Sequence, residues 1–82
     1  MKAKWYLDND KKNLCKVTRD PDGDAMVIKV NYTLNWDWDY PDPDDLAVIT
    51  KGTLVPTSVA KATLTNWAKA LSDKLFFADD LG

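Results

Sequence analysis

Hydrophobic and polar residues alternate most regularly between residues 25 and 40. The apolar positions of this stretch are Met26, Ile28, Val30, Tyr32, Leu34, Trp36, Trp38 and Tyr40. Polar residues lie between most of them, which predicts a β-strand with one buried and one solvated face, as in an antiparallel sheet. Fully extended, residues 25–40 would reach roughly 50 Å, whereas strands of small domains are usually shorter. We therefore expect the strand either to bend or to carry its far end, from Trp36 to Tyr40, beyond the core.

Two shorter strands are predicted before this stretch, at residues 2–7 and 14–19, with a polar turn over residues 8–13 between them. A second turn is predicted over residues 20–24, which read Asp-Pro-Asp-Gly-Asp. Its proline presets φ, and Gly23 readily adopts the left-handed conformation that a tight turn needs. The second turn is of hairpin type, so the strands that it joins should be antiparallel.

One more strand is expected after the long one. Pro41 and Pro43 cannot donate a hydrogen bond to a ladder, so they should end the long strand. Strand structure is expected to resume over residues 46–50 and, after a bulge or a second turn at residues 51–52, over residues 53–55.

A C-terminal helix is expected from about Thr57 to about Phe76, with Thr57 or Ser58 as its N-cap. Apolar residues at helical spacing would form the face that packs on the sheet: Ala60, Leu64, Trp67, Leu71 and Leu75. The fold class predicted for residues 1–82 is therefore α+β in a single domain. It is a small four-stranded antiparallel β-meander with one C-terminal α-helix packed on one face (ββββα).

The composition argues against catalysis. All thirteen acidic residues are Asp, and the chain has no His, so it lacks the usual general base near neutral pH and the commonest transition-metal ligand. The three glycines are scattered and form no phosphate-binding loop. We expect no catalytic residue, no cofactor and no metal in the main interpretation, and hence not an enzyme.

The chain also lacks the signals of export. Its basic start does not continue into a signal-peptide core, because Asp8 directly follows the apolar residues 5–7. The longest apolar run is too short to cross a membrane. A single cysteine, Cys15, excludes an internal disulfide and is most simply a small core residue. We expect a soluble, cytoplasmic protein.

Calcium binding is an alternative that the acids raise. Asp20, Asp22 and Asp24 alternate as at the start of a calcium loop, but Ala25 and Asn31 occupy the positions where an EF-hand needs Gly and a bidentate acid. The acids between residues 37 and 45 have a better ligand count, so an acidic-loop calcium module stays open there.

The layout of charge is the most informative feature under the meander model. The first and third connections of a meander lie at the same end of the sheet, and the helix would run back to that end. Ten acids should then gather at one pole: Asp8, Asp10, Asp37, Asp39, Asp42, Asp44, Asp45, Asp73, Asp79 and Asp80. Only three lysines accompany them, although the whole chain carries a net charge of only −2. A simple preference of turns for Asp is the competing explanation.

This pole would repel phosphates, so nucleic acid is not expected to bind there, whereas a basic groove of another protein would attract it. The predicted partner-binding residues combine acids with exposed aromatics: Trp36, Asp37, Trp38, Asp39, Tyr40, Asp42, Asp44 and Asp45. The strongest basic grooves belong to nucleic-acid-binding proteins, so a host protein of that class is the expected partner. In size, acidity and lack of catalytic groups, the chain is similar to small phage inhibitors of host defence, such as anti-CRISPR and anti-restriction proteins, although no motif carries this likeness.

Two interpretations from other classes stay open at this point. A small structural or assembly protein, for example a virion or scaffold subunit, would pair through its exposed sheet edges. The calcium module is the second. The sequence leaves open whether the chain is a monomer or a small oligomer.

Overall fold

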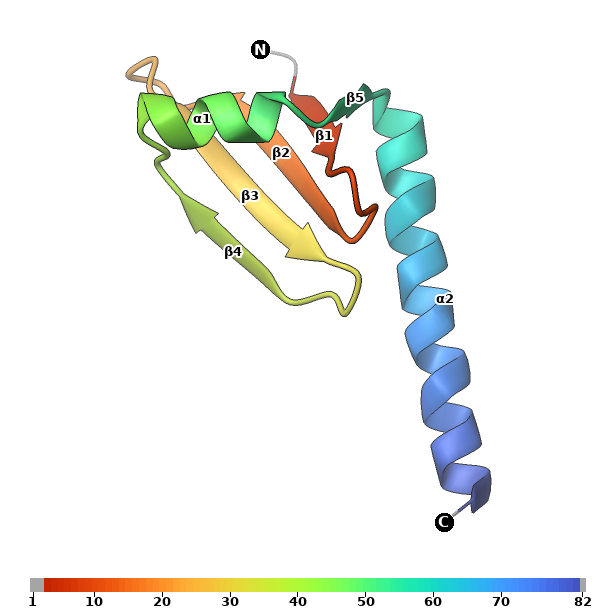
Figure 1. Cartoon of the computed structure of the whole chain (residues 1–82). Coiled ribbons are helices and arrows are strands. Elements are labelled where there is room, and N and C mark those ends of the chain that lie inside the picture. Colours follow the sequence, from red (N-terminus) through yellow and green to blue (C-terminus); the bar gives the residue numbers. More distant parts are fainter. Residues whose placement is uncertain (1–2, 82) are drawn as a thin grey trace.

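The computed structural model describes the backbone of residues 3–81 and the side chains of residues 3–73. Over these residues, five strands and two helices follow one another along the chain (Figure 1). They are β1 (Lys4–Leu7), β2 (Asn13–Arg19), β3 (Ala25–Asn31), β4 (Trp36–Asp39), α1 (Pro43–Thr50), β5 (Thr53–Val55) and α2 (Thr57–Leu81).

The strands form one sheet in the order β4-β3-β2-β1-β5, and every neighbouring pair is antiparallel. The predicted α+β fold, an antiparallel sheet followed by a C-terminal helix, is confirmed. β1 to β4 form the meander, and the short β5 adds a fifth strand on the outer side of β1.

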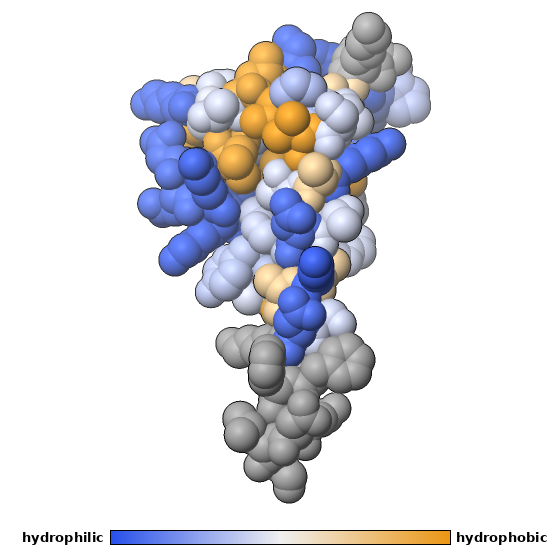
Figure 2. All heavy atoms as spheres, turned by 90° about the vertical axis from the view of Figure 1, so that its right-hand side faces the viewer, coloured by the Kyte–Doolittle hydropathy of each residue, from blue (hydrophilic) through white to orange (hydrophobic). Residues whose placement is uncertain are grey.

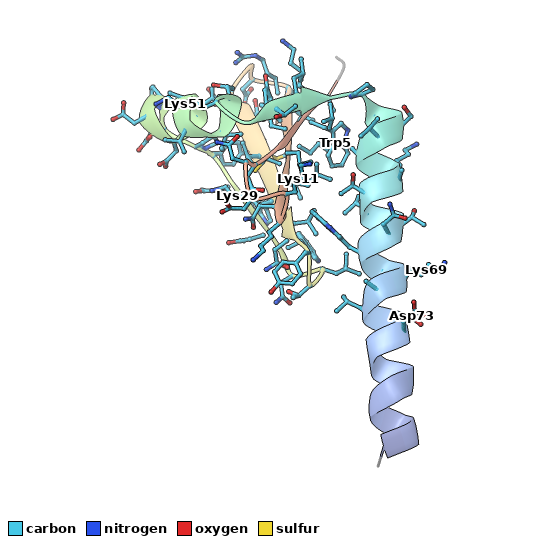
Figure 3. All side chains as sticks on the ribbon, turned by 45° about the vertical axis from the view of Figure 1, so that its right-hand side comes forward. Trp5, Lys11, Lys29, Lys51, Lys69 and Asp73 are labelled. Atoms are coloured by element: carbon cyan, nitrogen blue, oxygen red, sulfur yellow. The ribbon has the colours of Figure 1, made fainter. Side chains whose placement is uncertain are left out.

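The two helices lie on opposite sides of the sheet. Directly opposed residues of neighbouring strands share a face, so Trp5, Leu14 and Ile28 belong to one face and Tyr6, Cys15 and Val27 belong to the other. Figure 3 shows Trp5 between the sheet and α2, with α1 on the other side. α2 makes its main contact with β1, and its C-terminal half extends past the sheet (Figure 1).

The core of the described residues is small. The only described side chains that are almost fully buried are Leu14 and Ala60, on the α2 side, and Val27, on the α1 side. Many large hydrophobic side chains stay exposed: Tyr32, Leu34, Trp36, Trp38, Tyr40, Val48, Leu54 and Val59. Figure 2 shows hydrophobic residues gathered on the surface around the first turns of α2. The sheet is therefore only partly covered by its own helices.

The long strand predicted over residues 25–40 is interrupted by a turn. The Asn31 carboxamide oxygen accepts hydrogen bonds from the backbone N–H groups of Thr33 and Asn35, each at 3.0 Å. The N–H of Leu34 donates to the carbonyl of Asn31, and Leu34 adopts a left-handed conformation with φ of 62°. The chain thus reverses after Asn31, and residues 36–39 return beside β3 as β4 instead of overhanging the core.

The strand predicted over residues 46–50 is wrong, because these residues belong to α1. Asp42 is the N-cap of this helix, and its Oδ1 accepts a hydrogen bond of 2.9 Å from the N–H of Asp45. Pro43 occupies the first helical position, where a missing N–H costs nothing. Lys51 and Gly52 form a turn that leads into β5.

The helix predicted from Thr57 is confirmed, and its backbone continues to Leu81. The N–H of Ala60 donates to the carbonyl of Pro56, so Thr57 and Ser58 lie in the first turn and do not act as the N-cap. Its less exposed side chains include Ala60, Leu64, Trp67 and Leu71, as predicted, and the side chain of Leu75 lies outside the described residues. Over its described part, neither helix is both long and apolar enough to cross a membrane.

The predicted acidic pole is wrong. Asp8 and Asp10 lie in the β1–β2 turn, whereas Asp42, Asp44 and Asp45 lie at the start of α1, near the other end of β3 (Figure 1). The reason is that β4 is a separate strand, so the chain reverses once more than the meander model assumed. Asp73 projects away from the sheet in Figure 3, and the side chains of Asp79 and Asp80 lie outside the described residues.

Gly52 is required by a close approach between α1 and the sheet. A Cβ atom at this position would lie 2.7 Å from the backbone oxygen of Leu7, so Gly52→Ala should cost about 1–3 kcal/mol of unfolding free energy. Gly23→Ala is the matched control. Its φ of +90° strains any L-residue, but a Cβ there meets no atom within 4 Å, so about 1 kcal/mol is expected. Urea unfolding measures both losses, and a smaller loss for Gly52→Ala than for Gly23→Ala would contradict this packing.

Leu14 should carry much of the stability on the α2 side of the sheet. Its side chain is 0% exposed, so Leu14→Ala should lower the unfolding free energy by about 2–5 kcal/mol. Val48→Ala removes methyl groups from a side chain that is 67% exposed, and it should change stability by less than about 0.5 kcal/mol. Thermal or urea unfolding would decide, and similar losses for the two variants would place Leu14 outside the core.

Candidate functional site

β4 is an edge strand that carries four of the eight predicted binding residues. It pairs with β3 on one side, and no described strand pairs with its other side. Its aromatic side chains are widely exposed, at 67% for Trp36 and 51% for Trp38, and Tyr40 just after the strand is also 51% exposed. We call Trp36, Trp38 and Tyr40 the aromatic edge. Clustered exposed aromatic rings on an edge strand are typical of a surface that contacts another molecule.

The register separates the aromatic and acidic residues of β4. Trp36 and Trp38 lie opposite Val30 and Ile28 of β3, which places them on the α2 side of the sheet. Asp37 and Asp39 lie opposite Lys29 and Val27, on the α1 side. The predicted surface is therefore brought together along one strand, but its two chemical components face opposite sides of the sheet.

The backbone of β4 directs the N–H groups of its aromatic residues outward. The N–H of Asn31 donates to the carbonyl of Asn35 at 3.0 Å, which makes this pair hydrogen-bonded across the hairpin. Antiparallel pairs alternate, so Trp36 and Trp38 occupy positions whose backbone groups point away from β3. The outer edge of β4 is thus formed by backbone groups that a further strand could use.

Two of the predicted acids bind this outer edge. Oδ1 of Asp37 accepts a hydrogen bond from the N–H of Trp38, and Oδ1 of Asp39 accepts one from the N–H of Tyr40, both at 2.8 Å. Each carboxylate therefore caps an edge donor that would otherwise be free for another strand. We call these two side chains the carboxylate caps.

The other three predicted acids have a local role in α1. Asp42 caps the helix, and Asp44 and Asp45 lie in its first turn, where the helix dipole favours negative charge. They follow β4 in the chain through Tyr40 and Pro41. Their position is explained by helix formation, so they add negative charge near the edge without forming a distinct binding site.

Two residues that the sequence placed on the buried face of the long strand, Tyr32 and Leu34, are also exposed. Tyr32 is about half exposed in the β3–β4 turn, with Nζ of Lys12 5.7 Å from its ring centroid, and Leu34 is exposed beside it. Trp38 and Tyr40 pack edge to face, with ring centroids 5.7 Å apart. Two asparagines, Asn31 and Asn35, flank this turn and are the signal that could have revealed it.

Cys15 is a half-buried thiol on the α1 face, opposite Lys29. Burial raises the pKa of this thiol, although the nearby Lys29 charge lowers it in part. It lines a hollow between α1 and the β1–β2 turn together with Tyr6, Ile49 and Lys51. A thiol with a raised pKa is a weak nucleophile, so Cys15 is not suited to nucleophilic chemistry in this hollow.

Among the described residues, no three Asp or Cys side chains come close enough together to hold a metal ion. Oδ1 of Asp20 accepts hydrogen bonds from the N–H groups of Asp22 and Asp24, at 3.0 and 2.9 Å. These bonds close the turn that the sequence predicted there. The described acids between residues 37 and 45 belong to no such metal-holding group, and they accept backbone N–H groups or lie in the first turn of α1.

No protein family model, no curated protein and no solved structure matches this chain. The functional interpretation therefore depends on the geometry of the β4 edge.

Asp8 should show the acid sensitivity of the β1–β2 turn. Partial burial raises its pKa, but hydrogen bonds from the Asn13 side chain and the backbone N–H groups of Lys12 and Asn13 outweigh this, so the pKa lies below the ordinary value of 3.8. A lowered folded-state pKa stabilises the fold above about 3.8, and this stabilisation is lost as the pH falls through the folded-state value. NMR titration of the Asp8 carboxyl carbon should give a midpoint below 3.8. Asp8→Asn should remove this titration and reduce the acid dependence of stability, and a midpoint above 3.8 would contradict the assignment.

Proposed function

We propose that this protein is a non-enzymatic inhibitor that binds a basic partner protein through the β4 edge. The observation that carries the proposal is the aromatic edge, where Trp36 and Trp38 of the edge strand β4 and Tyr40 just after it are half or more exposed. Such rings are typical anchors of protein interfaces because they bury a large area with little loss of conformational entropy.

The charge of the edge supports a basic partner. Asp37 and Asp39 lie on β4, and Asp42, Asp44 and Asp45 follow within a few residues, whereas Lys29 is the only basic residue directly opposite β4. Negative charge of this density attracts a basic surface and repels phosphates. Because the aromatics and carboxylates face opposite sides of the sheet, a groove that encloses the edge strand fits better than a flat surface.

Basic grooves of this kind are typical of proteins that hold DNA or RNA. A nucleic-acid-binding host protein is therefore the partner that we propose, with the chain acting in the manner of a phage anti-defence inhibitor. The small size, the all-Asp acidity and the lack of His support this role, and the single cysteine supports a cytoplasmic location.

Assembly with copies of itself is the second candidate, favoured by the small core and the free edge. The negative charge of β4 disfavours the simplest form of assembly, in which two β4 strands pair edge to edge. When two β4 strands pair antiparallel over most of their length with Trp36 and Trp38 on a common face, Asp residues also lie opposite Asp residues. Like charges directly opposed destabilise a sheet. The mass in solution separates the two candidates, since the inhibitor should be a monomer when alone.

The test begins with affinity capture of the partner by the tagged protein and its identification by mass spectrometry. Binding kinetics with the purified partner should then show an association rate that falls as salt rises, because charge steers the encounter. Trp38→Ala should raise the dissociation rate at least about tenfold, since it removes a central anchor. A variant with Asp37→Asn and Asp39→Asn should mainly lower the association rate at low salt.

The matched control carries Asp22→Asn and Asp24→Asn, which make the same charge change in the β2–β3 turn. This control should bind with rates close to those of the parent. If Trp38→Ala binds like the parent, or if the two Asn double variants behave alike, the β4 edge is not the binding surface.

A further inference from the structure

The outer edge of β4 is a backbone template as well as a side-chain surface. The N–H groups of Trp38 and Tyr40 point away from β3, and each is held only by the carboxylate of the residue before it. The hydrogen bonds of a further β-strand would use these same donors. A strand that adds here must therefore displace the carboxylate caps.

Because the carboxylate caps must be displaced, the incoming strand needs positively charged residues at particular positions. When a carbonyl oxygen of that strand takes the N–H of Trp38, the carboxylate of Asp37 loses a charge-assisted hydrogen bond and becomes free on the α1 side of the sheet. A residue directly opposite Asp37 on the new strand shares that face. A lysine or arginine there offers the freed carboxylate a new partner, whereas a neutral or acidic residue does not.

The other face of the edge sets an apolar requirement. Residues of the incoming strand opposite Trp36 and Trp38 would lie on the α2 side, against indole rings that are 67% and 51% exposed. Apolar side chains at those positions would cover the rings. The matching strand therefore alternates apolar and basic residues.

The chain already contains one strand with this pattern. On the inner side of β4, Ile28, Lys29 and Val30 of β3 lie opposite Trp38, Asp37 and Trp36. The apolar-basic-apolar order of β3 thus shows what the side chains of β4 accept as a neighbour. A second copy of β4 does not have this order, because its Asp residues would meet Asp.

We propose that β4 binds an extended segment of the partner protein as an additional strand, and that this segment alternates basic with apolar residues. This inference rests on the proposed function and specifies the partner segment. The basic residues of the segment form ion pairs with the carboxylates of Asp37 and Asp39, and its apolar residues cover the aromatic edge. The backbone N–H groups of Trp38 and Tyr40 donate hydrogen bonds to the new strand.

Short synthetic peptides test the sequence requirement. The probe is a peptide that alternates Lys and Val, and its control has the same composition with the Lys and Val residues in separate blocks. A second control alternates Thr and Val. Titration followed by tryptophan fluorescence and by NMR amide shifts should show the Lys-Val alternating peptide binding at least about tenfold tighter than either control, which corresponds to about 1.4 kcal/mol. Equal affinity of the alternating and block peptides would show charge attraction alone and would overturn strand addition.

Two variants at residue 40 test the backbone requirement. Tyr40→Ala removes the ring but keeps the N–H, and Tyr40→Pro removes both. This N–H is bound by Asp39 and lies just after the strand, so its loss should leave the β3 ladder intact, which circular dichroism and melting would verify. The Lys-Val peptide should bind Tyr40→Pro several-fold more weakly than Tyr40→Ala. Equal affinities would contradict use of the Tyr40 donor.

Hydrogen exchange on the complex with the captured partner distinguishes this inference from the proposed function. Strand addition should slow exchange of the Trp38 and Tyr40 amides. If the partner binds in a Trp38-dependent manner while both amides exchange at the free rate, strand addition is wrong and the binding function stands. If Trp38→Ala does not weaken partner binding at all, the proposed function itself fails.

Discussion

The hairpin between β3 and β4 depends on the side chain of Asn31. Its carboxamide oxygen accepts the backbone N–H groups of Thr33 and Asn35 and the hydroxyl of Thr33, at 2.7 to 3.0 Å. These bonds fix where the chain reverses, and the reversal point fixes the register of β4. The register in turn decides which side chains of β4 face α2, which face α1, and which backbone groups point to the open edge.

The hairpin also explains how far the sequence could predict this fold. Alternation correctly indicated antiparallel strands, and helical spacing correctly indicated α2. Alternation could not reveal the turn, because the β3–β4 register pairs even-numbered residues with even-numbered residues, such as Ile28 with Trp38. The apolar side chains therefore keep to one face before and after the reversal. A hydrophobic pattern with a period of two is therefore the same whether or not the chain makes a turn of this length.

The second error had a different physical origin. Asp42 and Pro43, followed by two further acids, form a helix N-terminus in which the carboxylate of Asp42 binds the N–H of Asp45. Pro41 and Pro43 are also residues that end a strand. The short apolar run over residues 46–49 is compatible with either a strand or a helix. The residues of the candidate surface could be named from the sequence, but the turn that places four of them on an edge strand could not. Aromatics and carboxylates of β4 lie on opposite faces because successive residues of a strand alternate, and the turn before β4 places this strand at the open edge of the sheet.

Five of the described Asp side chains accept hydrogen bonds from backbone N–H groups. Asp20 closes the β2–β3 turn, Asp8 closes the β1–β2 turn, Asp42 caps α1, and Asp37 and Asp39 cap the edge of β4. Asp suits this role because its short side chain reaches backbone groups close in sequence.

At the outer edge of β4, the hydrogen bonds from Asp37 and Asp39 have a further consequence. An exposed strand bearing two tryptophans invites pairing with any other strand, and carboxylates bound to its free donors, together with the repulsion between two such edges, oppose that pairing. Under the strand addition that we propose, a partner that brings cations would remove both obstacles at once, and the features that oppose pairing of β4 with its own copies would also select the strand that it accepts.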